Sequence, residues 1–174
     1  MNTIFQDWEV NNGNIKGQIV LLLFRIASKL SALPKPVRWI GYPYAAIYRV
    51  VVEWILCIEI PWKLKLGPET RLFHGQGLVI NDSAIIGRNC ILRHNTTIGV
   101  ANTSLDFKGS APVIEDNVDI GAGAIILGAI RIGSGARIAA GSVVIKDVPR
   151  DSTVGGNPAK LISIRSSTLE ALSE

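Results

Sequence analysis

The sequence predicts a mainly β protein, a parallel β-helix of hexapeptide repeats preceded by an N-terminal helical segment. Aliphatic residues recur every six positions, a period that neither an α-helix nor a flat strand has. A small residue often follows, which suits short strands joined by identical tight turns. Of the 174 residues, 48% are hydrophobic and 18% are charged, which excludes a disordered chain. The aliphatic positions are Ile80, Ile86, Leu92, Ile98, Ile114, Ile120, Ile126, Ile132, Ile138 and Val144.

Two helices are expected before the repeat, over residues 15–31 and 43–58. Arg49 and Glu53 lie at i and i+4 in the second segment, which favours a helix. Its Val and Ile content leaves a strand as the alternative. Proline and glycine break the chain between the two segments, at Pro34, Pro36, Gly41 and Pro43.

Neither of these two helical segments is expected to span a membrane, because charged residues interrupt each of them before about 18 consecutive apolar residues are reached. The first 17 residues are polar and carry Asp7 and Glu9, so no signal peptide is expected. We therefore expect a cytoplasmic protein, with the inner face of the membrane as a peripheral contact.

The chain divides into an N-terminal helical region at residues 1–62, a β-helix domain at 63–162 and a C-terminal tail at 163–174. The tail is expected to be a short helix or a frayed end. Leu66 and Leu72 also fit the six-residue period, and a two-residue slip then leads to Ile80.

A loop is predicted at residues 100–113, because sixteen residues rather than six separate Ile98 from Ile114. Its composition is polar. Long loops on a rigid scaffold usually carry function, and a simple surface insertion is the alternative.

Charge and cysteine content exclude several classes of protein. The net charge is +4, and the basic residues are scattered through the repeat without interleaved aromatic residues, so no nucleic-acid surface is expected. A phosphate-bearing small molecule or an anionic membrane surface would suit this balance. Cys57 and Cys90 predict neither a disulfide framework nor a zinc site, and Cys90 is expected in the core.

The only two histidines, His74 and His94, are predicted to share one face of the β-helix. Eighteen residues complete one coil, so a separation of twenty, one coil plus the slip, stacks them roughly 4.8 Å apart. The next positions on this face are Ala122 and Ala140. Such a column predicts a groove for a slender ligand that ends at a base. The alternative for each histidine is an ordinary surface or hydrogen-bonded residue.

His74 has the more informative setting, because glycines flank it in His74-Gly-Gln-Gly77 and allow a ligand or a neighbouring subunit to approach closely. An imidazole is also well suited to accept a hydroxyl proton near neutral pH. We therefore expect His74 to be a general base.

A succession of motifs supports this assignment. They are Glu59…His74-Gly-Gln-Gly-Leu-Val-Ile, Arg93-His94-Asn-Thr-Thr-Ile-Gly99, Pro112-Val-Ile-Glu, Ile120-Gly-Ala-Gly-Ala-Ile-Ile-Leu-Gly128, Ala140-Gly-Ser-Val-Val and Gly155-Gly-Asn-Pro-Ala159. Over roughly residues 45–162 they resemble the serine acetyltransferase branch of the hexapeptide acyltransferases, closest to the exopolysaccharide O-acetyltransferases of the colanic acid type. The resemblance implies a left-handed β-helix, a homotrimer with its site between subunits, and acetyl-CoA as donor.

The resemblance also implies roles for individual residues. The catalytic histidine corresponds to His74, and its acidic partner, fifteen residues earlier, to Glu59. The alternative for Glu59 is that it caps the preceding helix or faces solvent. The coenzyme groove is implied to run past Gly99, Ala122, Ala140 and Lys160, and no metal is expected.

Two departures from serine acetyltransferases bear on the acceptor. Phe73 stands where that branch has an aspartate, and Ser110-Ala111 stand where it has an Arg-His pair. Those charged residues hold the amino acid, so we expect a saccharide acceptor instead, bound by Phe73, Arg93 and His94.

The sequence therefore predicts an acetyl-CoA-dependent O-acetyltransferase of polysaccharide biosynthesis, acting on a small or lipid-linked saccharide. Serine O-acetylation for cysteine biosynthesis is the alternative within the same family. A non-enzymatic β-helix scaffold and a metal-dependent hydratase are alternatives of other classes. Two histidines are too few for the usual three-histidine metal site, unless Glu59 or a neighbouring subunit contributes a ligand.

Overall fold

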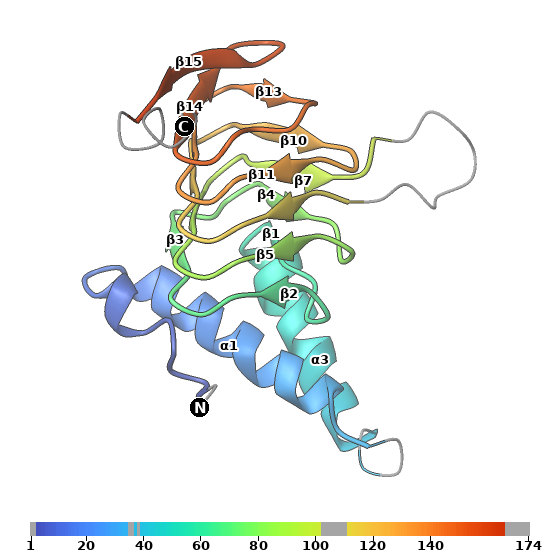
Figure 1. Ribbon diagram of the computed structural model, residues 1–174. Coiled ribbons are helices and arrows are strands. Elements are labelled where there is room, and N and C mark those ends of the chain that lie inside the picture. The colour runs from blue at the N-terminus through green and yellow to red at the C-terminus, as the bar shows by residue number, and fades with distance from the viewer. Residues whose placement is uncertain (1–2, 35–36, 38, 102–110, 166–174) are drawn as a thin grey trace.

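A helical cap lies at one end of a β-helix in the computed structural model, which describes residues 3–34, 37, 39–101 and 111–165 (Figure 1). The cap begins with a short 3₁₀ turn, η1 (Glu9–Asn11), and the long helix α1 (Ile15–Ser31). After a second 3₁₀ turn, η2 (Trp39–Gly41), come α3 (Tyr42–Tyr48) and the π-helical segment η3 (Arg49–Ile55).

Three parallel sheets form the sides of the β-helix. Sheet A contains, in spatial order, β1 (Ile58–Glu59), β4 (Leu78–Ile80), β7 (Thr97–Gly99), β10 (Ile125–Leu127) and β13 (Val143–Val144). Sheet B contains β2 (Lys65–Leu66), β5 (Ile85–Ile86), β8 (Val113–Ile114) and β11 (Arg131–Ile132). Sheet C contains β3 (Arg71–Phe73), β6 (Ile91–Arg93), β9 (Asp119–Ile120), β12 (Arg137–Ile138), β14 (Ser152–Gly155) and the antiparallel β15 (Lys160–Ile164).

The residues that recur every six positions form the core of this β-helix, as predicted. All ten aliphatic repeat positions are buried, and they form one cluster with the buried face of the cap. Each buried position projects inward from its strand, so the strands stack through both backbone hydrogen bonds and aliphatic contacts.

The pairing register confirms both the slip and the loop. Ile58 pairs with Leu78, twenty residues on, which is one eighteen-residue coil plus two. Thr97 pairs with Ile125, twenty-eight residues on, which leaves ten residues outside the coil. Of the predicted loop, residues 102–110 lie outside the described part of the chain.

The second predicted helix is confirmed up to Ile55, but its last turn is wrong. Cys57 has a positive φ of 54°, which ends the helix, and Ile58 already belongs to β1. Strand pairing thus begins five residues before the expected boundary at residue 63. At the other end, the tail begins as part of β15, and residues 166–174 lie outside the described residues.

Buried polar contacts hold α1 against the first coil. The Arg25 guanidinium pairs with the Asp7 carboxylate at 2.7 Å and donates to the Leu66 carbonyl at 2.7 Å. The Asn11 amide donates to the Thr70 carbonyl at 2.8 Å. The cap is therefore packed against the strand that leads to His74. Across the described ranges, no helix is both long and apolar enough to cross a membrane.

Candidate active site

His74 lies at a bulged corner between β3 and β4 and has a φ of 64°, a conformation uncommon for a residue with a side chain. Two backbone hydrogen bonds hold this corner. The Gly75 N–H donates to the Phe73 carbonyl at 2.8 Å, and the Gly77 N–H donates to the Cys57 carbonyl at 2.7 Å. Gly75 itself has a φ of 72°, which favours glycine, and a Cβ atom there would lie 2.9 Å from the Ile58 side chain.

The two imidazoles meet as the sequence predicts. Phe73 pairs with Arg93 across β3 and β6, which places the next residues, His74 and His94, over one another. Their ring centroids are 5.6 Å apart with an interplanar angle of 77°. The Nδ1 atom of His94 is buried and has no hydrogen-bond partner in the described part of the chain. Such an atom calls for a partner beyond the described residues, such as water, substrate or another subunit.

Ala122 and Ala140 continue this column, as predicted. The His94 carbonyl accepts from the Gly123 N–H at 3.0 Å, and the Ala122 carbonyl accepts from the Gly141 N–H at 2.9 Å. We call His74, His94, Ala122 and Ala140 the histidine–alanine column. Ala122 is half-buried and Ala140 is exposed, so methyl groups leave open space above the two imidazoles.

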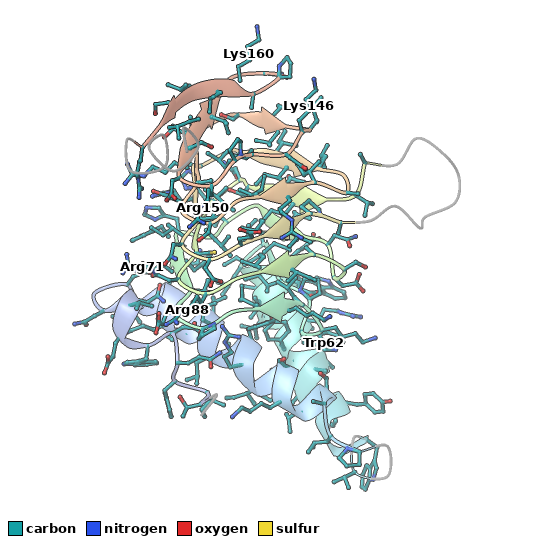
Figure 2. The ribbon with its side chains drawn as sticks, in the orientation of Figure 1. Trp62, Arg71, Arg88, Lys146, Arg150 and Lys160 are labelled. Carbon is teal, nitrogen blue, oxygen red and sulfur yellow. The ribbon has the colours of Figure 1, made fainter. Side chains whose placement is uncertain are left out.

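Gly99 and Lys160 are not part of the histidine–alanine column. Gly99 is the last residue of β7, the central strand of sheet A, and pairs with Leu127 of β10. Lys160 is exposed, opens β15 opposite Gly155, and projects at the end of the β-helix farthest from the helices (Figure 2). A coenzyme in contact with all these residues would have to extend beyond the column.

Glu59 lies near the corner that carries His74 but forms no hydrogen bond with it. Glu59 is exposed on β1 and pairs with Val79, and the two residues before it contact the corner that carries His74. No hydrogen bond between Glu59 and His74 occurs among the described residues. The carboxylate–imidazole pair therefore stays a prediction.

A groove of about 640 Å³ runs along the outer face of sheet A beside Glu59. Burial raises the pKa of the Glu53 carboxyl on its wall, the Arg49 guanidinium at 3.4 Å opposes this shift, and Glu59 adds to it. The groove thus holds two neighbouring carboxylates. Its other lining residues include Trp62, Lys63, Asn81, Asp82, Thr97, Gly99 and Leu127.

Phe73 and Arg93 lie beside the histidines on sheet C. Phe73 is 38% exposed, and the Arg93 guanidinium lies 5.8 Å from its ring centroid. Arg93 also forms an ion pair with Asp119 and donates to the Ile120 carbonyl at 2.7 Å. Its charge is therefore already paired within the chain. Phe73 offers an open apolar surface next to His74.

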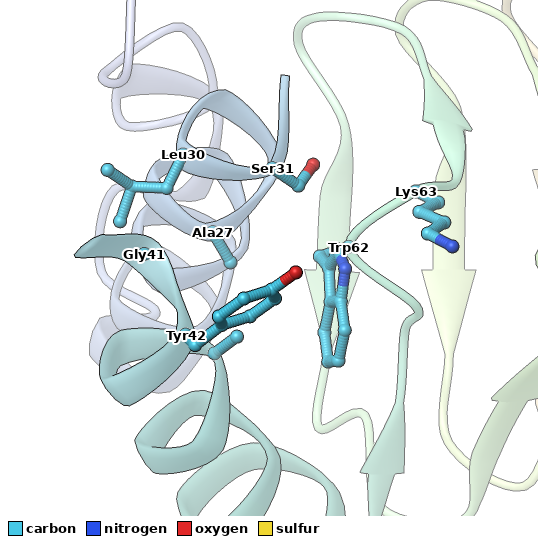
Figure 3. Close-up of a pocket in the computed structure, with 8 residues that line it drawn as sticks. Ala27, Leu30, Ser31, Gly41, Tyr42, Trp62 and Lys63 are labelled. Carbon is cyan, nitrogen blue, oxygen red and sulfur yellow. The ribbon is translucent and has the colours of Figure 1, made fainter. Parts of the chain in front are cut away.

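A second pocket of about 200 Å³ lies between α1 and α3, where Tyr42 and Trp62 form part of its wall (Figure 3). Among its described lining residues, Lys63 is the only charged one, and none carries an imidazole or a carboxylate. It therefore lacks a base for hydroxyl activation. No group of three or more histidine, cysteine or acidic side chains able to hold a metal ion occurs within the described ranges.

The sequence analysis missed the residues that shape the groove, above all Trp62, Asn81 and Asp82. Asn81 and Asp82 follow the repeat position Ile80 directly and occupy the outer corner of that coil. Their spacing from Ile80 was a usable signal. No sequence signal pointed to Trp62, because its contact with Arg49 depends on how the cap packs. The Arg49 guanidinium lies 5.0 Å from the centroid of the Trp62 ring.

Comparison with known proteins places this geometry among acetyltransferases. Residues 111–146 match the family model described as bacterial transferase hexapeptide (six repeats). Serine acetyltransferase 4 of Arabidopsis thaliana is 38% identical over 149 residues, covering 86% of this chain and 40% of that protein. The serine acetyltransferase of Synechococcus elongatus is 42% identical over 105 residues, covering 60% of this chain and 42% of that protein. The chain thus spans less than half the length of these curated relatives.

The similarity to solved structures extends over more of the chain. Soybean serine acetyltransferase complexed with serine is 31% identical, with a TM-score of 0.75, over 90% of this chain and 67% of that chain. Serine acetyltransferase from Brucella abortus in complex with coenzyme A is 28% identical, with a TM-score of 0.77, over 94% of this chain and 67% of that chain.

Proposed function

We propose that the chain, which belongs to the hexapeptide-repeat serine acetyltransferase family, transfers an acetyl group from acetyl-CoA to a hydroxyl group, with His74 as general base. One observation carries the proposal: the imidazole of His74 lies at the end of a column whose other end is lined only by methyl groups. A slender thioester fits along such a column with its reacting end at the imidazole. The coenzyme A complex of the Brucella relative supports acetyl-CoA as donor.

The reaction needs one proton relay. His74 accepts the proton of the acceptor hydroxyl while the oxygen attacks the thioester carbonyl, and the resulting tetrahedral oxyanion collapses with release of the coenzyme thiolate. The imidazolium then returns its proton to that thiolate. Glu59 would orient the imidazole by accepting from its second ring nitrogen.

A homotrimer would complete this site. The resemblance assigns Gly99 to the coenzyme groove, yet within one chain Gly99 ends β7 of sheet A, whereas His74 lies at the corner between β3 of sheet C and β4 of sheet A. Packing the Gly99 end of β7 in one subunit against the His74 corner of the next would bring both to the same thioester and would partner the buried His94 Nδ1. Sedimentation should give a trimer, and a monomer at micromolar concentration would contradict this assembly.

Serine is the leading acceptor, because the curated relatives are serine acetyltransferases and the soybean structure holds serine. These comparisons support the serine alternative better than the saccharide expected from the sequence. Nothing in them supports the exopolysaccharide subgroup.

A saccharide hydroxyl is the second candidate, on a specific observation. Beside His74 lies Phe73 rather than an acidic side chain, and the nearby Arg93 is already paired with Asp119. The groove next to Glu59 combines Trp62, Asn81 and Asp82, an aromatic ring with amide and carboxylate groups. Such a set suits sugar rings, which present apolar faces and many hydroxyl groups.

The test is coenzyme thiol release from acetyl-CoA, measured with serine, nucleotide sugars and oligosaccharides in parallel. His74→Ala serves as the control for background thioester hydrolysis. Thiol release that depends on an acceptor and on His74 supports the proposal, and the acceptor that raises it most distinguishes the two candidates. Equal release by both proteins with every acceptor would contradict it.

A further inference from the structure

The proposed reaction creates one charge that has no assigned partner. When the acceptor oxygen attacks the thioester, the carbonyl oxygen becomes an oxyanion, which is best stabilised by a hydrogen-bond donor that is in place before the reaction begins. His74 does not supply this donor, because as general base it must first accept the proton of the acceptor hydroxyl. The donor therefore has to lie beside His74.

Backbone N–H groups at the corners of the histidine–alanine column are already used within the β-helix. The N–H groups of Gly75, Gly77 and Asn95 donate to carbonyl oxygens at 2.8, 2.7 and 2.7 Å respectively. Farther along the column, those of Gly123 and Gly141 donate at 3.0 and 2.9 Å. None of these five amides is free to hold an oxyanion.

The cation that precedes His94 in the chain is also engaged. Arg93 pairs with the Asp119 carboxylate and donates to the Ile120 carbonyl at 2.7 Å. The two charges therefore compensate each other on sheet C. Neither the guanidinium nor the carboxylate brings an unpaired charge to the two imidazoles.

The two ring nitrogens of His94 have different surroundings. The Nδ1 atom is buried and has no hydrogen-bond partner among the described residues. The Nε2 atom forms no hydrogen bond there either, but it is not enclosed, so it is the nitrogen that a ligand can reach. A neutral imidazole donates from one nitrogen and accepts at the other. The state of the buried nitrogen therefore decides what the open nitrogen can do.

Burial of Nδ1 favours a neutral His94 ring with its proton on Nε2. A protonated ring would enclose a charged N–H group without an acceptor, and its centroid would lie 5.6 Å from that of His74, which becomes an imidazolium during the reaction. Of the two neutral forms, the one with an enclosed, unpaired N–H is disfavoured, because such groups are rare in proteins. An N–H group of a neighbouring subunit that donates to Nδ1 would stabilise the same form.

We infer that His94 is a second catalytic residue, whose neutral imidazole donates from Nε2 to the oxyanion of the tetrahedral intermediate; this inference rests on the proposed acetyl transfer. His94 keeps its proton throughout, and His74 carries out the proton transfer. The attacking oxygen and the oxyanion share one carbon atom. A centroid separation of 5.6 Å lets two hydrogen bonds of about 2.9 Å converge on these neighbouring oxygens, one from each imidazole.

The first test examines His94 in the free full-length protein. The chain contains only two histidines, so labelling histidine with nitrogen-15 gives two imidazole spin systems, and His94→Gln identifies the one that belongs to His94. Long-range proton–nitrogen correlation spectra at pH 7 should show a neutral His94 ring protonated on Nε2. A ring protonated on Nδ1, or on both nitrogens, would overturn the inference even before an acceptor is identified.

The second test compares His94→Phe with His94→Gln, a matched pair. Phenylalanine keeps an aromatic ring against His74 but has no donor, whereas glutamine keeps an N–H donor at a similar distance from the backbone. With the acceptor that gives the most thiol release, His94→Phe should lower kcat about 10²–10³-fold and leave the acceptor KM within about twofold. His94→Gln should recover at least about tenfold of that loss. A raised acceptor KM with unchanged kcat would assign His94 to acceptor binding and overturn the inference.

Failure of this inference and failure of the proposed function give different results. If His74→Ala abolishes acceptor-dependent thiol release and His94→Phe leaves kcat unchanged, general base catalysis stands and the role of His94 is wrong. If the wild-type protein releases no thiol with any acceptor, the proposed reaction is wrong and the role of His94 is wrong with it. Circular dichroism verifies that each variant is folded.

Discussion

Arg25 should be the most sensitive polar residue of the cap. Its guanidinium is nearly buried, pairs with the Asp7 carboxylate at 2.7 Å, and donates to the carbonyls of Leu66 at 2.7 Å and Gly67 at 2.6 Å. Asp7 in turn accepts from the Thr70 N–H at 2.9 Å. Arg25→Met keeps the aliphatic stem but leaves a buried carboxylate and two carbonyl groups without these donors.

Breaking a buried ion pair by removing one partner costs about 3–5 kcal/mol. For a chain of this length, that corresponds to a fall of about 6–20 °C in Tm. Thermal unfolding followed by circular dichroism at fixed protein concentration measures it. Arg88→Met is the matched control, because Arg88 pairs with Glu69 at 3.1 Å with both side chains substantially exposed, and such a pair is worth about 0–1 kcal/mol. Equal shifts in Tm for the two variants would refute the reasoning.

Three further predictions concern the column and the cysteines. Ala140→Trp should fill the histidine–alanine column and weaken acetyl-CoA binding at least about tenfold in calorimetry, without lowering Tm, because Ala140 is exposed rather than part of the core; unchanged affinity would show that the coenzyme lies elsewhere. Burial raises the pKa of the Cys90 thiol from its ordinary value of 9.0 to about 11, so the unfolded chain loses this proton first and the free energy of unfolding should fall as pH rises from 9 to 11. A thiol reagent should accordingly titrate the exposed Cys57 in the folded protein and Cys90 only after unfolding, and rapid reaction of both would contradict the burial.

The sequence was sufficient for the β-helix because one residue type at one spacing determines it. Every repeat position from Ile80 to Val144 faces the core, and the same count placed His94 over His74. Local periodicity converts directly into stacking, since each coil repeats the geometry of the last. The two-residue slip could also be predicted, because it lies between the repeat positions Leu72 and Ile80.

The six-residue period could not predict the contacts between different elements. The pairing of Arg93 with Asp119 joins side chains one coil apart, and the groove depends on how Trp62 packs against Arg49 from the cap. The early start of the β-helix at Ile58 depends on the positive φ of Cys57, a residue type with no preference for that conformation. Such features arise from tertiary packing, which a period in the sequence does not encode.

The most direct test of the proposed reaction is the rate of acetyl transfer by His74→Ala under single-turnover conditions, with acetyl-CoA binding measured on the same protein. His74 lies at the end of the histidine–alanine column, so removing its imidazole should lower the rate by about 10²–10⁴-fold and leave the affinity for acetyl-CoA within about twofold. A variant that keeps more than about a tenth of the wild-type rate would contradict the role of His74 as general base.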